Sequence, residues 1–343
     1  MFQSFVRRSL LLAAGLALFA VPAFAQKNTW VNISDSVTDQ LAKDGKKIGY
    51  PGLTAGVTVD PTTGEVYMVV CDQGLWKSSD HGKTFARVDG GKIGGRTETG
   101  YALSFDPAGK RLACFMIYGA CTSTDDAGKT WNAWKTNHLD YGMVDWHDTG
   151  KTMLALRHEA GGVLCLTTDA GQTWTNLTKL APTKGNQNNV ALGMFDAKAL
   201  LASRGEGLWR STDAGQNWKP VALKGDLANI KLAAPTMTLR NSIGYWCTDK
   251  GIITSKDKGE TWSLLSDIKA VFGPHFGKTD SHMVVVTKDG FHESKDGGKT
   301  WTKAAPLPDK FGVGLVGHNY AWDPVNDLFY ASTMGNPTFK FER

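Results

Sequence analysis

The sequence predicts an all-β fold, a seven-bladed β-propeller, and three observations lead to this prediction. One octet with the pattern Ser/Thr-x-Asp-x-Gly-x-Thr-aromatic recurs along most of the chain. Short apolar runs separated by turn sequences supply about four strands to each repeat. The segment TWVNIS, near the start, has the sequence of a strand that follows an octet but has no octet before it. Repeats of this length that each form one small sheet are typical of propellers.

The octet occurs six times, and its aspartates follow one another at intervals of 39 to 46 residues. The carboxylate can accept backbone N–H bonds in a tight turn, and the glycine can adopt the positive φ that such a turn needs. The final aromatic residue begins the next strand and fills space between neighbouring sheets. These roles predict structural turns, and the ligand pattern of a calcium loop is absent, so no metal site is expected. The copies are SSDHGKTF from Ser78, TDDAGKTW from Thr124, TTDAGQTW from Thr167, STDAGQNW from Ser211, SKDKGETW from Ser255 and SKDGGKTW from Ser294.

The number of blades follows from the strands. The last repeat, NYAWDPVNDLFYASTMGNPTFKF, supplies three strands and leaves its sheet one strand short. We expect TWVNIS, residues 29–34, to complete this sheet by pairing with the C-terminal strand near residues 337–341. Such a closure removes exposed sheet edges. The first strands of the seven blades are predicted to begin near Leu53, Tyr101, Tyr141, Val190, Ala233, Val271 and Asn319.

The first 25 residues have the features of a bacterial export signal. Arg7 and Arg8 form a basic region, an apolar run follows, and Ala23-Phe24-Ala25 is a typical cleavage site. The apolar run is short for a membrane span. We therefore expect residues 1–25 to be removed and residues 26–343 to form a single propeller domain, periplasmic or secreted, without membrane insertion.

Charge and cysteine content limit the possible partners. The formal net charge is +5 and falls to +3 without Arg7 and Arg8, and no basic run is present, so nucleic-acid binding is not predicted. The five cysteines form no CxxC motif, which gives no support to a zinc site. Cys114 and Cys121 flank a short loop and either form a disulfide or pack as buried thiols. We expect no cofactor, and we expect the protein to be a monomer.

The octet is the Asp box, and the chain resembles the Asp-box (BNR-repeat) β-propeller families. These include sialidases, xyloglucanase-type glycosidases, sortilin-type receptors and photosystem assembly factors, and no single one of them is matched. The resemblance covers essentially all of the mature sequence. It implies that ligands bind on the face opposite the Asp boxes, where the loops between second and third strands and the linkers between blades lie.

Candidate site residues lie on the loops of that face. Arg157-His158-Glu159 and Arg204-Gly205-Glu206 come from adjacent blades and could present two arginines and two carboxylates together. Polar groups that converge on a propeller's mouth can form a ligand site, but exposed loops are polar in any case. The predicted ligand contacts are Arg96, Tyr101, Tyr118, Arg157, His158, Arg204, His318 and Asn319.

Two functional classes remain open. A glycosidase needs two carboxylates, and the candidates are Glu159, Glu206 and Asp72. Asp72 in CDQG corresponds, through the resemblance, to a catalytic aspartate of xyloglucanase-type enzymes, although CTDKG and KDG later repeat this feature as an ordinary turn would. A sialidase is disfavoured because the Phe-Arg-Ile-Pro signature is absent.

The alternative is a non-catalytic binding or assembly module that recognises a protein or an anionic glycan. The propeller scaffold carries many unrelated functions, so the fold does not choose between the two classes. The expected ligand is therefore a carbohydrate or a protein.

Overall fold

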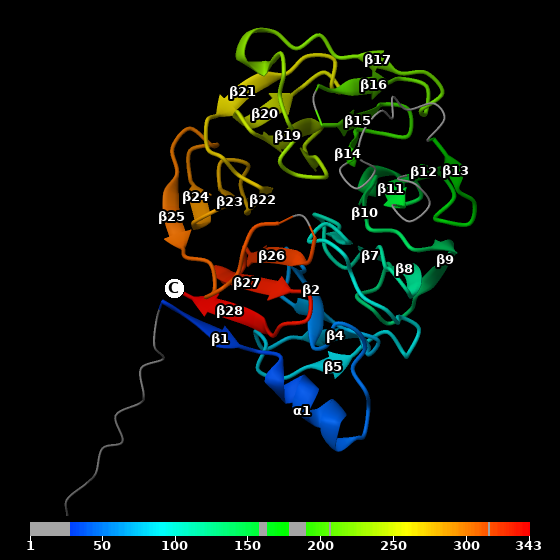
Figure 1. The fold of residues 1–343 in the computed structure, drawn as a ribbon, viewed down its shortest axis with the longest axis vertical. Coiled ribbons are helices and arrows are strands. Elements are labelled where there is room, and N and C mark those ends of the chain that lie inside the picture. Colours follow the sequence, from blue (N-terminus) through cyan, green and yellow to red (C-terminus); the bar gives the residue numbers. More distant parts are fainter. Residues whose placement is uncertain (1–27, 158–162, 178–189, 206, 315) are drawn as a thin grey trace, which may run out of the picture.

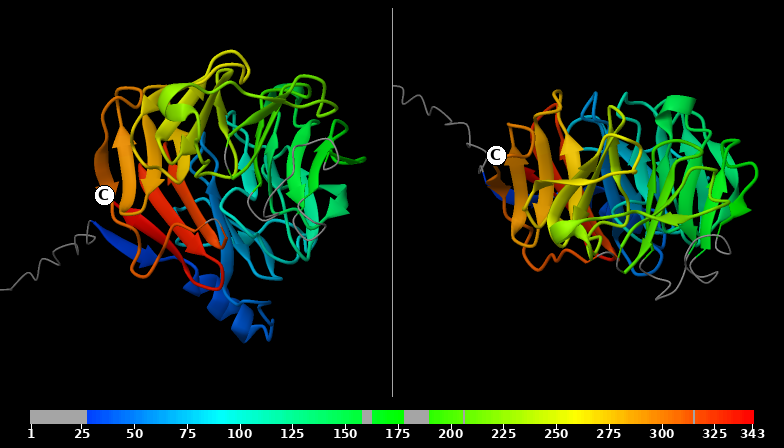
Figure 2. Two further views of the ribbon diagram at one scale, coloured as in Figure 1. Left: turned by 45° about the horizontal axis from the view of Figure 1, so that its top comes forward. Right: turned by 90° about the horizontal axis from the view of Figure 1, so that it is seen from above.

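The structure, a computed structural model, is a ring of seven four-stranded antiparallel sheets around a central axis (Figure 1). Seen from the side, the ring is a disc that is thinner than it is wide (Figure 2). The structure describes residues 28–157, 163–177, 190–205, 207–314 and 316–343. The predicted all-β, seven-bladed propeller is confirmed. The predicted export signal lies outside the described residues.

Each blade contributes one strand to each of four concentric layers. The innermost strands are β2 (Thr54–Val59), β6 (Leu103–Phe105), β10 (Tyr141–Val144), β14 (Val190–Met194), β18 (Thr238–Arg240), β22 (Phe272–Phe276) and β26 (His318–Asp323). The second strands are β3 (Val66–Val70), β7 (Leu112–Cys114), β11 (Met153–Arg157), β15 (Leu200–Arg204), β19 (Ile243–Thr248), β23 (Met283–Thr287) and β27 (Leu328–Thr333).

The two outer layers flank the octets. The third strands are β4 (Gly74–Ser78), β8 (Ala120–Thr124), β12 (Val163–Thr167), β16 (Trp209–Ser211), β20 (Gly251–Ser255), β24 (Gly290–Ser294) and β28 (Thr338–Glu342). The outermost strands are β5 (Ala86–Arg87), β9 (Asn132–Asn137), β13 (Thr175–Asn176), β17 (Lys219–Pro220), β21 (Ser263–Ser266), β25 (Thr302–Ala305) and β1 (Thr29–Asn32).

The N-terminal strand closes the ring as predicted. β1 pairs antiparallel with β28, so that Trp30 faces Phe341, and the two ends of the described chain lie side by side (Figure 1). The Trp30 ring also packs 6.0 Å from the Phe291 ring of the preceding blade, and its indole N–H donates to the Pro306 carbonyl. The first strand therefore joins two blades as well as completing one.

The six octets form one repeated turn, which confirms the predicted structural role. In the second copy, the Thr130 N–H and hydroxyl donate to the two oxygens of Asp126, at 2.8 and 2.7 Å. The Gly128 N–H donates to the Thr124 hydroxyl at 2.9 Å. These hydrogen bonds favour the ionised carboxylate and lower the pKa of Asp126 to about 2. The octet glycine has a positive φ, and in the third copy a side chain at Gly171 would also collide with Trp134 of the preceding blade.

An aromatic pair joins two blades from opposite parts of the ring. The Tyr101 ring, which precedes β6, stacks 4.9 Å from the Phe272 ring of β22. The Tyr101 hydroxyl donates to the Val271 carbonyl at 3.3 Å. Burial raises the pKa of Tyr101, as expected for a phenol surrounded by apolar groups.

Two local features differ from the prediction. A helix, α1 (Asp35–Lys43), follows β1 and buries Val37 and Leu41 against blade 1. The innermost strand of blade 5 begins at Thr238 and not near Ala233, because the Ala233 N–H donates to the Cys247 carbonyl in a loop that Pro235 then interrupts. Short 3₁₀ turns, η1 (Trp146–Asp148) and η3 (Gly225–Leu227), complete the described helical structure.

All five cysteines are free and buried. Cys114 faces Thr122 across β7 and β8, so the side chain of Cys121, one residue away, points to the other side of the sheet. Of the two alternatives for Cys114 and Cys121, the structure thus shows buried thiols. Among the described residues there is no helix of the length and apolarity that a membrane crossing needs.

Candidate functional site

The two faces of the ring are built from different connections. The octets and the turns between first and second strands form one face, and the remaining loops with the linkers between blades form the other, which we call the linker face. There, distant segments pair: Arg96 bridges Ile117, and Thr99 bridges Val316. The Gly317 N–H also donates to the Glu98 carbonyl at 2.7 Å. The linker face therefore brings parts of four blades into contact.

An arginine flanked by two exposed tyrosines lies on the linker face. The guanidinium carbon of Arg96 is 5.3 Å from the centre of the Tyr50 ring and 4.9 Å from that of Tyr118. Tyr50 is 77% exposed and Tyr118 is 62% exposed. They come from the linker after α1, from the linker after β5 and from the loop between β7 and β8. We call Tyr50, Arg96 and Tyr118 the tyrosine–arginine surface.

The charge of Arg96 is compensated within the protein. Its side chain is only 12% exposed, and its Nε donates to the Met334 sulfur at 3.2 Å. The Glu98 carboxylate is 3.8 Å away and 15% exposed, and its Oε2 has no hydrogen-bond partner among the described residues. The guanidinium thus binds two rings and an internal carboxylate. The surface is rich in aromatic area and nearly neutral.

The loop between β3 and β4 supports this surface. The Gly95 N–H donates to Oδ1 of Asp72 at 2.9 Å, and the Gln73 side-chain amide donates to the Lys47 carbonyl at 2.6 Å. Asp72 has a positive φ of 58°, a conformation that aspartate tolerates better than most residues. Asp72 therefore lies on the predicted face with one carboxylate oxygen engaged by backbone. Its catalytic role stays a prediction.

Three other predicted ligand contacts interact with groups of the protein itself. The Tyr101 ring stacks on the Phe272 ring. Asn319 is fully buried and donates to the Ala55 carbonyl at 3.1 Å. The Nδ1 of His318 lies 3.0 Å from the Val316 carbonyl oxygen. None of these contacts belongs to the tyrosine–arginine surface, and the predicted ligand contacts of these three residues stay predictions.

The predicted pair of arginines lies on neighbouring blades. Arg157 ends β11 and donates to the Thr136 hydroxyl. Arg204 ends β15, and burial lowers the pKa of its guanidinium. His158, Glu159 and Glu206 lie outside the described residues, so their convergence with the two arginines stays a prediction.

Sequence reasoning missed Tyr50. The only signal was an unusually long linker between TWVNIS and the first strand of blade 1, which ends in Tyr-Pro-Gly. Arg96 and Tyr118 were predicted, but nothing in their spacing shows that Tyr50 lies next to them. This proximity depends on how the linker before β2 packs on blade 1, where the Gly49 N–H donates to the Cys71 carbonyl and Gln73 holds Lys47.

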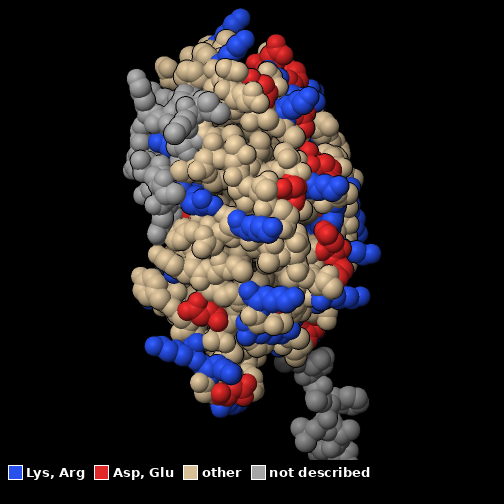
Figure 3. Space-filling view, turned by 90° about the vertical axis from the view of Figure 1, so that its right-hand side faces the viewer, with Lys and Arg blue, Asp and Glu red and all other residues tan. Residues whose placement is uncertain are grey.

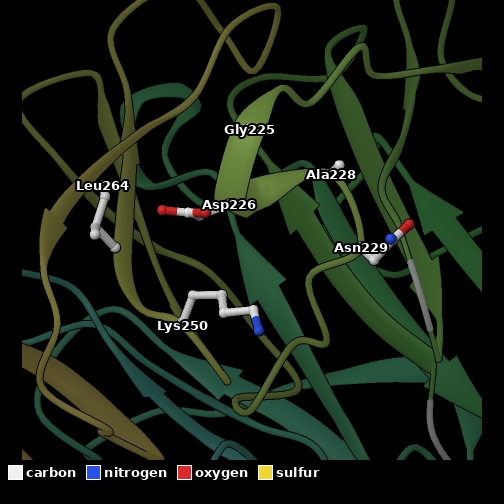
Figure 4. Close-up of a pocket in the computed structure, with 6 residues that line it drawn as sticks. All are labelled: Gly225, Asp226, Ala228, Asn229, Lys250 and Leu264. Carbon is white, nitrogen blue, oxygen red and sulfur yellow. The ribbon is translucent and has the colours of Figure 1, made fainter.

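A hollow lies at the rim of the linker face. This hollow of about 350 Å³ is lined by Gly225, Asp226, Ala228, Asn229, Lys250 and Leu264. In Figure 4, Asp226 points toward Leu264, and the ammonium group of Lys250 ends nearer Asn229. No aromatic side chain lines this hollow. The outer side of the ring near β9, β13 and β17 carries basic and acidic side chains interspersed, without a continuous field of one sign (Figure 3).

The fold and this face define the class of protein, a seven-bladed propeller whose linker face carries an aromatic surface. No family model matches the chain. It is 32% identical over 159 residues to a probable oligoxyloglucan-reducing end-specific xyloglucanase of Neosartorya fischeri, covering 42% of this chain and 19% of that protein. It is 25% identical over 266 residues to sortilin of Rattus norvegicus, covering 71% and 30%. The chain thus spans less than a third of these relatives' length.

Solved structures agree on the fold. The GH74 enzyme of Niastella koreensis superposes with a TM-score of 0.54 at 16% identity, covering 85% of this chain and 52% of that one. YCF48 bound to D1 peptide gives 0.50 at 15% identity, covering 93% and 98%. At these identities the likeness shows the fold alone. With the relatives, it confirms the predicted resemblance to glycosidase-like and sortilin-like propellers without one family being matched.

Proposed function

We propose that this chain is a carbohydrate-binding propeller that holds an uncharged part of a glycan on the tyrosine–arginine surface. The observation that carries the proposal is the pair of exposed tyrosine rings on either side of Arg96. Exposed aromatic rings give large apolar contact at small entropic cost. The similarity to a protein named as a xyloglucanase supports a glycan as ligand.

Binding is favoured over hydrolysis by the state of the nearby carboxylates. Glycoside hydrolysis needs an acid and a second carboxylate on opposite sides of the bond. On the described part of the linker face, Asp72 accepts a backbone N–H and Glu98 is paired with Arg96. The catalytic candidates of the alternative, hydrolysis, stay Glu159, Glu206 and Asp72. Export to the periplasm or the medium, with removal of residues 1–25, is part of the proposal.

Titration calorimetry with neutral β-glucan and xyloglucan oligosaccharides tests the proposal. Tyr50→Ala and Tyr118→Ala are each expected to weaken binding by about tenfold, the size of one lost aromatic contact. Leu264→Ala is the control, because Leu264 is exposed on the rim hollow and touches neither tyrosine. If both tyrosine variants bind as the parent does, the surface is not the site. If the protein releases reducing sugar, and Glu159→Gln or Glu206→Gln abolishes this release, the chain is a glycosidase and the proposal of binding alone is wrong.

A protein ligand is the second candidate. Tyrosine and arginine are the residues most enriched at the energetic centres of protein interfaces, and exposed Val316 lies on the same face. A pull-down with an immobilised peptide library separates the two. Peptide binding lost in Tyr118→Ala, together with no binding of any oligosaccharide, would favour this candidate.

A further inference from the structure

The Asp72 carboxylate touches both the segment that carries Tyr50 and the segment that carries Arg96. We infer that Asp72 is a positioning residue for the tyrosine–arginine surface. Asp72 lies between Gly49 and Gly95, which immediately precede Tyr50 and Arg96. By contacting both glycines, Asp72 sets the separation of the Tyr50 ring from the Arg96 guanidinium. The effect on ligand binding rests on the proposed function.

The contact with Gly95 is a closed pair of hydrogen bonds. The Gly95 N–H donates to Asp72 Oδ1 at 2.9 Å, and the Asp72 N–H donates to the Gly95 carbonyl at 2.9 Å. The next residue, Arg96, exchanges two backbone hydrogen bonds with Ile117, at 3.1 and 3.0 Å. The segment that carries Arg96 is therefore held between Asp72 on one side and the Tyr118 loop on the other.

The contact with Gly49 is a close approach that only glycine permits. A Cβ atom at position 49 would lie 1.8 Å from Asp72 Oδ2. The Gly49 N–H donates to the Cys71 carbonyl at 2.8 Å, and Gln73 holds Lys47, so the backbone cannot back away from the carboxylate without losing these bonds. Glycine is needed here for space, which ties the position of Tyr50 to that of the Asp72 side chain.

Blade 5 contains the same pair of hydrogen bonds without a tyrosine–arginine surface. The Lys231 N–H donates to Asp249 Oδ1 at 2.9 Å, and the Asp249 N–H donates to the Lys231 carbonyl at 2.9 Å. This pair lies in the part of the ring across from blade 1 (Figure 1). This pair of hydrogen bonds between an aspartate and a linker is therefore a structural feature of the propeller itself. Blade 1 adds to it the contact with Gly49. Asp249 supplies a matched control.

The test combines hydrogen exchange with ligand affinity in the full-length protein. Asp72→Ala should speed amide exchange in residues 47–52 and 94–97 and weaken binding of a neutral oligosaccharide by about tenfold, since a charged acceptor is lost. Asp72→Asn should restore both, because its carbonyl oxygen still accepts from Gly95. Asp249→Ala should speed exchange near Lys231 and leave affinity unchanged.

Gly49→Ala provides a second route if Asp72→Ala folds poorly. Alone, it should weaken binding by displacing the carboxylate. In the Asp72→Ala background, where only the Cβ atom at 2.8 Å remains in its way, its further effect should be smaller than its effect alone, which is the signature of coupling. Unchanged affinity in Asp72→Ala despite faster exchange would overturn the inference. So would an Asp72→Asn variant that exchanges as fast and binds as weakly as Asp72→Ala does. If the parent binds no oligosaccharide, the proposed function fails, and exchange in the two segments decides the inference by itself.

Discussion

The octet face and the linker face of this ring are built on opposite principles. On the octet face, the same few hydrogen bonds recur six times, each within eight residues of chain, as with Asp126 and Thr130. On the linker face, contacts join segments far apart in sequence, as with Arg96 and Met334. The repeated face stabilises the turn of each blade, and the irregular face joins distant segments and carries the candidate site. The comparison teaches that the stabilising pattern and the functional pattern occupy different ends of the same strands.

The largest effect is expected from opening the ring. Deleting residues 28–34 removes β1 together with the contacts of Trp30 to Phe341 and Phe291. We expect a loss of about 5 kcal/mol or more in the free energy of unfolding, comparable to the whole stability of many domains. Thermal unfolding followed by circular dichroism measures it. Deleting only residues 1–25 is the control, and equal stability of the two truncated forms would contradict the closure.

The contact of an octet with the preceding blade should show in Gly171→Ala. A Cβ there would lie 2.5 Å from Trp134, and φ is +81°, so we expect a cost of roughly 2–3 kcal/mol. The matched control is Gly297→Ala, one octet position earlier in the sixth copy. No atom lies near its Cβ position, and alanines adopt this conformation at the same place in three other copies. Gly297→Ala should be close to neutral in urea unfolding. If Gly171→Ala and Gly297→Ala cost the same free energy of unfolding, the contact with Trp134 is not the reason that position 171 needs glycine.

The octets should also make the protein sensitive to acid. Hydrogen bonds from Thr130 and Thr173 lower the pKa values of Asp126 and Asp169 to about 2, below the usual 3.8. A carboxylate with a lowered pKa contributes stability that is complete above about pH 4 and is lost as the pH falls through 2. The melting temperature should therefore drop steeply between pH 4 and pH 2. A double Asp126→Asn and Asp169→Asn variant should melt lower at neutral pH and show a shallower drop, and an unchanged slope would refute the assignment.

The smallest effect concerns ligand charge on the linker face. Glu98→Gln removes the carboxylate 3.8 Å from Arg96, so binding of an acidic oligosaccharide should improve by about two- to fivefold while neutral ligands bind as before. Glu65→Gln is the control, since it makes the same change in net charge beside Lys77 and outside the tyrosine–arginine surface. An equal gain in both variants would show only a general effect of net charge.

Much of the fold could be predicted because its signals are local. An octet specifies its own turn, since its donors and acceptors all lie within eight residues. The strand TWVNIS predicted the closure onto the C-terminal strand near residues 337–341, which the structure shows as β28. Local signals failed where a contact from another blade decided the outcome. The α1 helix forms because Val37 and Leu41 find an apolar surface on blade 1, and blade 5 begins late because its linker bonds to Cys247.

The candidate site could be predicted only in part, for a related reason. Sequence patterning placed Arg96 and Tyr118 on the correct face, because loops between given strands must emerge at a given end of a sheet. It could not place Tyr50 beside Arg96, since the two positions are 46 residues apart and meet only because both segments pack on the loop between β3 and β4. The sequence by itself thus determined the blades, their number and their closure. Only the tertiary structure decided which linkers meet, because that depends on the loop against which each of them packs.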